Sequence, residues 1–201
     1  MLVFDVIGQL NTAAFHVADS VASPALNSVM AILAESFFVV LPLLVIYMFL
    51  KKDRNVVPFM IMAVAAYIIA DIIKIIVREP RPCTVPQLSW INAVGCESST
   101  FSFPSGHATV LTGLSFFLGN YKYIRALYIF YVILILFGRV YLGQHYFTDV
   151  IAGIALSIVV ASAVYWKRNW INKAAEPVYR FADSVVEKLT NMIYGKTPKN
   201  V

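Results

Sequence analysis

Residues 139–149 read Arg139-Val-Tyr-Leu-Gly-Gln-His145-Tyr-Phe-Thr-Asp149, a polar stretch that joins the ends of two long apolar segments, 124–142 and 148–166. Each apolar segment has about the 20 residues that a helix needs to cross a bilayer. Ionisable side chains are costly next to hydrocarbon, so their presence at this junction indicates a functional site. The stretch therefore predicts two membrane helices joined by a short connection that carries chemistry.

Two further polar clusters stand at the ends of apolar segments. Residues 74–82 read Lys74-Ile-Ile-Val-Arg-Glu-Pro-Arg81-Pro82, and residues 104–107 read Pro104-Ser105-Gly106-His107. With the first stretch they bring cationic side chains together with two histidines. This combination suggests chemistry on an anion, and phosphate is the best candidate.

The composition places the chain among integral membrane proteins. Of its 201 residues, 60% are hydrophobic and 13% are charged, whereas soluble domains are about one-quarter charged. The net charge of +5 does not require a nucleic acid partner, because membrane proteins carry extra Lys and Arg on one side. We expect an all-α bundle in one membrane-embedded domain, residues 1–201, with five transmembrane helices at 32–50, 56–77, 107–120, 124–142 and 148–166.

Residues 1–30 differ from the predicted spans. Their polar residues recur at steps of four and three and so form one stripe on a helix. This pattern favours an amphipathic helix in the membrane interface; a crossing segment, which would give six spans, is the alternative. The segment lacks a basic start and a small-residue cleavage site, so we do not expect a removed signal peptide. The stripe consists of Asp5, Gln9, Thr12, His16 and Asp19.

Basic residues predict the orientation of the bundle. All but four of the 16 Lys and Arg residues fall in segments 51–55, 121–125 and 167–201, which five spans place on one side of the membrane. An excess of Lys and Arg marks the cytoplasmic side. We therefore expect the basic amphipathic tail, residues 170–201, in the cytoplasm and all three polar clusters on the extracytoplasmic face. The exceptions are Lys74, Arg78, Arg81 and Arg139.

Cys83 and Cys96 both fall in the polar loop 78–104, on the outer side, where the environment can be oxidising. We expect a disulfide that closes a small loop beside Arg81. Two unpaired thiols are the alternative, because sequence spacing does not establish geometry.

His145 and Asp149 are four residues apart. Residues with this spacing share a helix face, so Asp149 can accept a hydrogen bond from one imidazole nitrogen of His145. The other nitrogen is then a nucleophile or base. The alternative is a histidine that only hydrogen-bonds inside the bundle.

Ser105, Gly106 and His107 lead into the third predicted span. A turn into a helix N-terminus offers free backbone N–H groups and a positive dipole end to an anion. The Ser105 hydroxyl adds a donor, although a helix N-cap explains the same serine.

Lys74, Arg81 and Arg139 supply three cations for a predicted phosphate site. Each has an ordinary explanation as well: an ion pair with Asp71, a loop charge, or a side chain that reaches the headgroups. Their occurrence with two histidines on one face of the membrane favours the phosphate site. Other polar and aromatic residues nearby are interpreted as loop charges (Arg78, Glu79) or interfacial aromatics (Tyr141, Tyr146, Trp166).

The patterns Lys-x6-Arg-Pro, Pro-Ser-Gly-His and Arg-x5-His-x3-Asp, in this order from Lys74 to Asp149, resemble the three signature motifs of the type 2 phosphatidic acid phosphatase superfamily. The resemblance implies a membrane phosphatase that requires no metal or other cofactor. Gly138 is a departure, because that family usually has serine before the arginine of the third motif. One hydroxyl contact to phosphate would therefore be absent.

The resemblance also implies a role for each residue. His145 would attack phosphorus and form a phosphohistidine, with Asp149 orienting it. His107 would donate a proton to the leaving oxygen and then activate water, so a neutral His145 and a charged His107 predict a bell-shaped pH profile. The phosphoryl oxygens would be held by Lys74, Arg81, Ser105, the Gly106 backbone and Arg139.

The overall layout is similar to undecaprenyl pyrophosphate phosphatases of the bacitracin-resistance type, with an amphipathic start, five spans and a basic tail. This similarity favours hydrolysis of a polyprenyl diphosphate, of the undecaprenyl or dolichyl type, to the monophosphate and inorganic phosphate. A phosphatidylglycerophosphate or phosphatidate phosphatase is the alternative. The lipid substrate and the bilayer are the expected partners.

Two other classes of protein are less consistent with the sequence. An anion transporter would place its charges near the midplane, often with internal repeats, whereas these clusters lie at one face. A zinc site of His107, His145 and Asp149 is conceivable, but the three nearby cations argue against a metal. Haloperoxidases of the same superfamily bind vanadate in a similar pocket, but they are soluble.

Overall fold

The computed structural model describes residues 2–194, and within this range every regular element is helical. The end of the predicted tail, residues 195–201 with Lys196 and Lys199, lies outside the described residues. The helices are α1 (Leu2–Ser20), α2 (Pro24–Glu35), α3 (Phe37–Leu50), α4 (Val56–Val77), α5 (Gly106–Leu114), α6 (Lys122–Tyr141), α7 (Phe147–Ala174) and α8 (Glu176–Tyr194), with short 3₁₀ helices η1 (Pro82–Thr84), η2 (Pro86–Leu88) and η3 (Ser115–Leu118).

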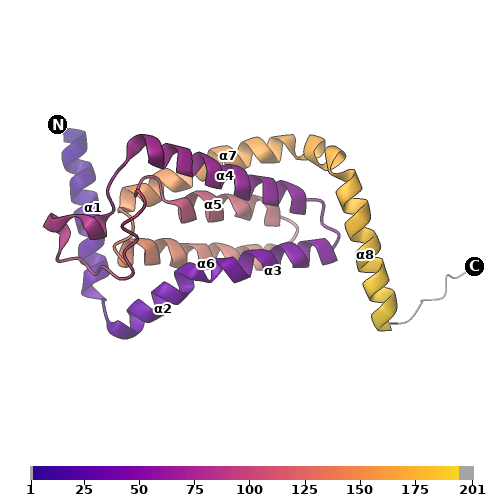
Figure 1. Cartoon of the computed structure of the whole chain (residues 1–201), viewed down its shortest axis with the longest axis horizontal. Coiled ribbons are helices and arrows are strands. Elements are labelled where there is room, and N and C mark those ends of the chain that lie inside the picture. Colours follow the sequence, from indigo (N-terminus) through magenta and orange to yellow (C-terminus); the bar gives the residue numbers. More distant parts are fainter. Residues whose placement is uncertain (1, 195–201) are drawn as a thin grey trace, which may run out of the picture.

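Helices α3 to α7 run along the long axis of the molecule, whereas α1 crosses one end and α8 crosses the other (Figure 1). The polar loop after α4 lies at the α1 end, where α6 also ends and α7 begins. The connection 51–55, the start of α6 and the end of α7 lie at the α8 end. The polar clusters and the described segments that carry the predicted cytoplasmic basic residues are therefore at opposite ends of the bundle.

The structure supports a membrane protein. Three segments are long enough and apolar enough to cross a bilayer: Val56–Thr84, which contains α4, and the helices α6 and α7. Helices α1 and α2 would together make a fourth, but they are bent by 119° where they meet. Helix α3 and the segment Gly106–Leu118 are apolar but shorter. The predicted helical membrane class is confirmed, while the count of five or six spans stays a prediction.

The first predicted span, 32–50, is wrong in its bounds because the helix breaks at Ser36. The Ser36 hydroxyl donates a hydrogen bond to the Leu33 carbonyl at 2.7 Å and lies 2.7 Å from the Tyr131 hydroxyl. A serine that bonds to the preceding turn competes with the helical ladder. Helix α2 therefore ends at Glu35, and α3 begins at Phe37.

The N-terminal segment forms a helix, α1, and its predicted amphipathic character is consistent with which side chains are buried. Phe15 and Ala18 are buried, whereas the five polar residues of the predicted stripe are exposed. The helix stops before Ser23, whose hydroxyl accepts a hydrogen bond from the Leu26 N–H at 3.3 Å and caps α2. The crosswise position of α1 (Figure 1) suits a helix in the membrane interface, which stays a prediction.

Helix α5 packs closely against α7 because small residues line their contact. A Cβ atom at Gly153 would lie only 2.8 Å from the Ser105 carbonyl oxygen and 2.7 Å from the Ala108 Cβ. One at Gly113 would lie 2.8 Å from the Ser157 Oγ. Small residues let helix backbones approach one another in a membrane. This packing fixes the start of α5 against the first turns of α7.

Candidate active site

The three polar clusters meet at the α1 end of the bundle. Lys74 lies in the last turn of α4, Arg139 in the last turn of α6, and Gly106 begins α5. The Lys74 ammonium group is 3.6 Å from the position that a Cβ of Gly106 would take. Lys74, Arg139 and His145 are all close enough to His107 for charge interaction. The residues predicted from separate parts of the sequence thus form one cluster.

His145 faces a carboxylate on one edge of its ring and a cation on the other. Its Nδ1 is 3.4 Å from Oδ2 of Asp149, and its Nε2 is 3.4 Å from Nη1 of Arg81. The side chain is buried, with 1% exposed. Asp149 thus lies beside Nδ1 as expected, although Nδ1 makes no hydrogen bond in the described part of the chain, and Nε2 is the nitrogen that faces the cations.

Asp149 is held in place by its position in the first turn of α7. Its Oδ2 accepts hydrogen bonds from the backbone N–H of Tyr146 at 2.9 Å and from the hydroxyl of Ser102. The carboxylate is fully buried. A carboxylate fixed in this way can hold the imidazole of His145 in one orientation and one tautomer.

The surroundings of His145 keep its imidazole neutral. Burial lowers the pKa of His145 from 6.5 to about 4, with Arg139 and Arg81 acting in the same direction and Asp149 in the opposite one. At neutral pH the ring therefore has an unprotonated nitrogen with a lone pair. This is the state that a nucleophile requires.

Ser105 is the N-cap of α5, as the alternative interpretation proposed. Its Oγ accepts a hydrogen bond from the Ala108 N–H at 3.5 Å, and its own backbone N–H donates to the Asp149 carbonyl at 3.1 Å. The cap uses the hydroxyl oxygen as an acceptor, so the hydroxyl hydrogen can still be donated to an anion. Capping and anion binding are thus compatible.

His107 is positioned by α2 and α3. Its ring lies next to the backbone of Ala34 and packs edge-on against Phe37, with centroids 4.8 Å apart. Its Nε2 is buried and has no hydrogen-bond partner within the described part of the chain. A buried polar atom of this kind marks a place that a ligand can fill.

Arg81 and Arg139 are both buried, and Arg81 has several partners. Its guanidinium donates to the Gln144 carbonyl at 2.9 Å, to Thr100 at 2.6 and 3.1 Å, and to Glu97 at 2.8 Å. Arg139 reaches Glu97 only at 4.0 Å, and its Nε has no hydrogen-bond partner in the described residues. Arg139 therefore retains unused donor capacity.

The predicted disulfide is present: Cys83 and Cys96 are bonded, with Cα atoms 5.9 Å apart. Gln144 ties the closed loop to the site, because its side-chain amide donates to the carbonyls of Val94 and Gly95 at 2.9 and 2.7 Å. Gln144 directly precedes His145, so the loop is fixed beside the candidate nucleophile.

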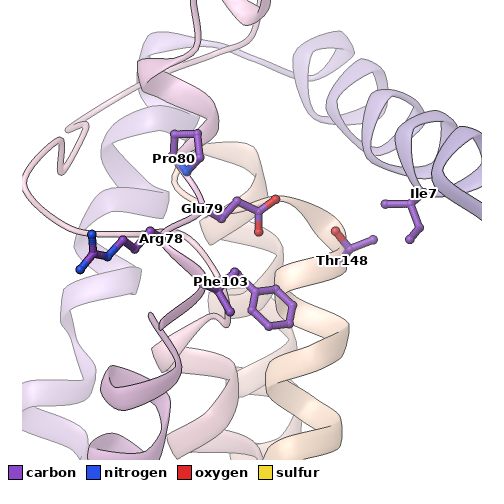
Figure 2. A pocket seen from close by; sticks show the side chains of 7 residues that line it. Ile7, Arg78, Glu79, Pro80, Phe103 and Thr148 are labelled. Carbon is purple, nitrogen blue, oxygen red and sulfur yellow. The ribbon is translucent and has the colours of Figure 1, made fainter. Parts of the chain in front are cut away.

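Glu79 was predicted to be a loop charge, but its half-buried carboxyl group lies close enough to Asp149 for the two acids to interact. Figure 2 shows the Glu79 side chain turned toward Thr148 of α7, whereas Arg78 points the other way. Both belong to a cavity of about 530 Å³ that also touches Ile7 and Phe103. Glu79 therefore adds a second acidic side chain beside Asp149.

Several residues of the site were missed from the sequence, namely Glu79, Glu97, Ser102 and Gln144. All four lie in irregular segments, where no helical period assigns a face. Glu97 had one usable signal, because it directly follows a cysteine of the predicted disulfide.

Tyr141, expected at the interface, is buried and donates to Asn27 at 2.6 Å. A side chain at Gly138 would contact Met30 of α2.

Within residues 2–194, no group of three or more His, Cys, Asp or Glu side chains is arranged to hold a metal ion. The candidate site is instead lined by Lys74, Arg81 and Arg139, whose charges suit an anion.

The chain belongs to the PAP2 superfamily, whose family model matches residues 55–173.

Similar proteins include three curated relatives. The undecaprenyl-diphosphatase of Sulfolobus acidocaldarius is 26% identical over 64% of this chain, and the match spans only 64% of that relative's length. Undecaprenyl-diphosphatase BcrC of Bacillus subtilis is 24% identical over 82% of this chain and 86% of its own. The lipid A 4'-phosphatase of Porphyromonas gingivalis is 28% identical over 59% of this chain and 55% of its own.

Two solved structures share the fold. LpxE of Aquifex aeolicus superimposes with a TM-score of 0.65 and 25% identity, covering 78% of this chain and 94% of that protein. The PAP2-type phosphatidylglycerolphosphate phosphatase of Bacillus subtilis gives a TM-score of 0.64 at 21% identity, covering 83% and 88%. The curated homologues are lipid phosphatases, which are hydrolases.

Proposed function

We propose that the protein is a membrane lipid phosphatase that hydrolyses a polyprenyl diphosphate, of the undecaprenyl or dolichyl type, to the monophosphate and inorganic phosphate. The observation that carries the proposal is the placement of His145, with Nδ1 facing Asp149 and Nε2 facing Arg81. Two relatives that are undecaprenyl-diphosphatases support the choice of substrate.

In the first step, Nε2 of His145 attacks the terminal phosphorus and the bond from phosphorus to the bridging oxygen breaks. The lipid monophosphate leaves with that electron pair, and protonated His107 donates its proton to the leaving oxygen. His145 is then a phosphohistidine whose positive ring is stabilised by Asp149.

In the second step, water attacks the same phosphorus while His107 accepts a proton from it. The phosphorus–nitrogen bond breaks, inorganic phosphate forms, and His145 recovers its lone pair. Atoms and charges balance without a cofactor. His107 needs its proton in the first step, and a bound phosphate dianion favours the charged ring in spite of the neighbouring cations.

The cations stabilise charge on the transferred phosphoryl group. Lys74, Arg81 and Arg139 approach the site from three different segments, so they can contact different phosphoryl oxygens. Ser105 donates its hydroxyl hydrogen, and the free N–H groups at the start of α5 provide further donors. In this proposal the protein's own cations take the role that metal ions have in other phosphatases.

We further infer that residues 1–201 form one domain with five spans, with the site on the extracytoplasmic face and the C-terminus in the cytoplasm. The separation of the polar clusters from segment 51–55 and α8 supports this orientation (Figure 1). An outward site at the end of the bundle suits a lipid whose phosphate lies at headgroup level.

A second candidate function is hydrolysis of a lipid phosphomonoester such as phosphatidylglycerophosphate or phosphatidate. The similarity to a lipid A 4'-phosphatase favours this class, because the identities to all three relatives are comparable. The anion transporter gains no support from the relatives.

Phosphate release by the purified protein in detergent, with a chelator present, distinguishes these functions. Undecaprenyl diphosphate, phosphatidylglycerophosphate and phosphatidate would be compared at equal surface concentration. We expect the diphosphate to give the highest kcat/KM, and His145→Ala to lower turnover by at least about 10³-fold. A higher kcat/KM on a monoester selects the second function, and no release from any substrate refutes the phosphatase.

A further inference from the structure

The cation cluster already contains an acidic side chain, Glu97. One oxygen, Oε2, accepts a hydrogen bond from Nη2 of Arg81 at 2.8 Å and lies 4.0 Å from Nη2 of Arg139. Lys74 also feels the attraction of this carboxylate. Two of the three cations that the proposed function assigns to phosphate, Arg81 and Arg139, therefore face the same oxygen, and Lys74 lies within range of the same carboxylate.

We propose that Glu97 is the resident anion of the phosphate site, and that substrate and product phosphate must displace its carboxylate to bind. The inference rests on the proposed function, because it takes these cations to be the phosphate ligands. A carboxylate oxygen and a phosphoryl oxygen accept hydrogen bonds from a guanidinium group in the same way. Glu97 and phosphate therefore compete for the same donors.

The backbone of Glu97 is anchored next to the site. Cys96 precedes it and is bonded to Cys83, two residues after Arg81. The Glu97 N–H donates to the side-chain oxygen of Gln144 at 3.4 Å. A tethered carboxylate has a high effective concentration at the cations, so a free competitor must be strong to replace it.

The carboxylate can nevertheless leave. The Glu97 side chain is 54% exposed, whereas those of Arg81 and Arg139 are 2% and 5% exposed. The acid can turn toward water while the buried cations keep their positions. When phosphate binds, it leaves water for the cations, and the Glu97 carboxylate leaves the cations for water.

The Glu97 carboxylate uses only some of the hydrogen-bond donors in the site, and this favours phosphate over Glu97 in the competition for them. The Nε of Arg139 and the Nε2 of His107 are buried and have no hydrogen-bond partner among residues 2–194. A phosphoryl group has several oxygens and can accept from more than one donor, whereas the carboxylate contacts Arg81 closely and Arg139 only at 4.0 Å.

The placement of Arg81 does not depend on Glu97 alone. Arg81 also donates to Thr100 and to the Gln144 carbonyl, at 2.6 and 2.9 Å. Removing the Glu97 charge should therefore leave a formed site. While Glu97 occupies the cations, phosphate cannot bind them, so the apparent affinity for every phosphate ligand falls with the fraction of time that Glu97 is bound. The same competition limits inhibition by the product phosphate.

The test is Glu97→Gln, which keeps the size of the side chain and removes its charge. Binding of inorganic phosphate would be measured by titration calorimetry on the full chain in detergent, and its Ki by inhibition of turnover. We expect both constants, and the KM for lipid substrate, to fall about five- to tenfold. The matched control is Glu35→Gln, since exposed Glu35 acts on Arg139 only through space and should change phosphate affinity less than about twofold.

Unchanged or weaker phosphate binding by Glu97→Gln would overturn the inference and leave Glu97 as a residue that only positions Arg81. Should the glutamine variant not fold, Glu97→Asp retracts the charge by one methylene and should tighten phosphate binding to a smaller extent; no tightening counts against the inference. The calorimetric comparison does not need turnover. If no variant hydrolyses any lipid, the phosphatase proposal fails, while phosphate binding still decides the role of Glu97.

Discussion

At the scale of single residues, His145 is defined by what touches the two edges of its ring. Asp149 faces Nδ1 at 3.4 Å, and Arg81 faces Nε2 at 3.4 Å. The Asp149 carboxylate accepts hydrogen bonds from Tyr146 and Ser102, and the Glu79 side chain lies nearby. These contacts leave Nε2 as the one ring atom directed at the cation cluster.

The acid side of the pH profile tests this environment. Since the pKa of His145 is lowered from 6.5 to about 4, mainly by burial, the nucleophile is neutral above that value and is lost only as the pH falls through it. We expect the acid limb of kcat/KM to lie near pH 4. Initial rates on a detergent-dispersed substrate measure it.

As a control, intrinsic fluorescence across the same pH range would show whether the protein stays folded. An acid limb near 6.5, with the protein still folded, would contradict the neutral, buried state of His145.

At the scale of elements, α5 is the piece that aligns the site. Its first turn carries Ser105 as the cap and His107 just inside, and its contact with α7 is made close by Gly153. Ser105 also donates from its backbone to the Asp149 carbonyl at 3.1 Å. The distance between the two histidines therefore depends on how α5 and α7 pack.

Gly153→Ala should disturb this alignment. The new Cβ would lie 2.8 Å from the Ser105 carbonyl oxygen, closer than such atoms can pack, so the start of α5 must shift. We expect a loss of about 1–3 kcal/mol in stability and a fall in kcat of about tenfold or more. Thermal unfolding and initial rates provide the two readouts.

The matched control is Gly8→Ala on α1, where a Cβ meets no atom within 4 Å. This change should leave activity and stability near those of the unmodified protein. Equal effects of the two substitutions would show that close packing at Gly153 is not what aligns the site.

At the scale of the whole molecule, the two crosswise helices mark opposite ends. Helix α1 lies beside the site, and α8 lies beyond the basic end of the bundle (Figure 1). The apolar residues Val178, Phe181, Val185 and Leu189 of α8 are exposed. An exposed apolar stripe on a helix across the bundle end suits the surface of the membrane.

Thiol labelling tests the orientation. Cys83 and Cys96, reduced in intact cells, should react with a membrane-impermeant maleimide, because the loop is proposed to face outward. Lys188→Cys in a background with both cysteines changed to serine should react only after permeabilisation. The reverse pattern would place the site in the cytoplasm.

Much of the candidate site can be predicted from the sequence because its residues have the spacing of secondary structure. His145 and Asp149 are four apart at a helix start, and the Ser105 turn precedes a helix. The roles of Glu79 and Glu97 could not be predicted, because both residues lie in an irregular loop that has no helical periodicity. The helix break at Ser36 could not be predicted either, because Ser36 contacts Tyr131 from another helix. The acidic residues of the loop therefore had no predicted face.

By itself, the sequence determined the helical membrane class, the family motifs and the set of cations and histidines, because these follow from composition, period and spacing. Only the tertiary structure decided how they face one another. It brought Glu97 onto Arg81, fixed the start of α5 against α7 through Gly153, and left Nε of Arg139 buried without a partner in the described residues. The physical reason is that such contacts join residues far apart in the chain, and their distances are set by packing rather than by any local pattern.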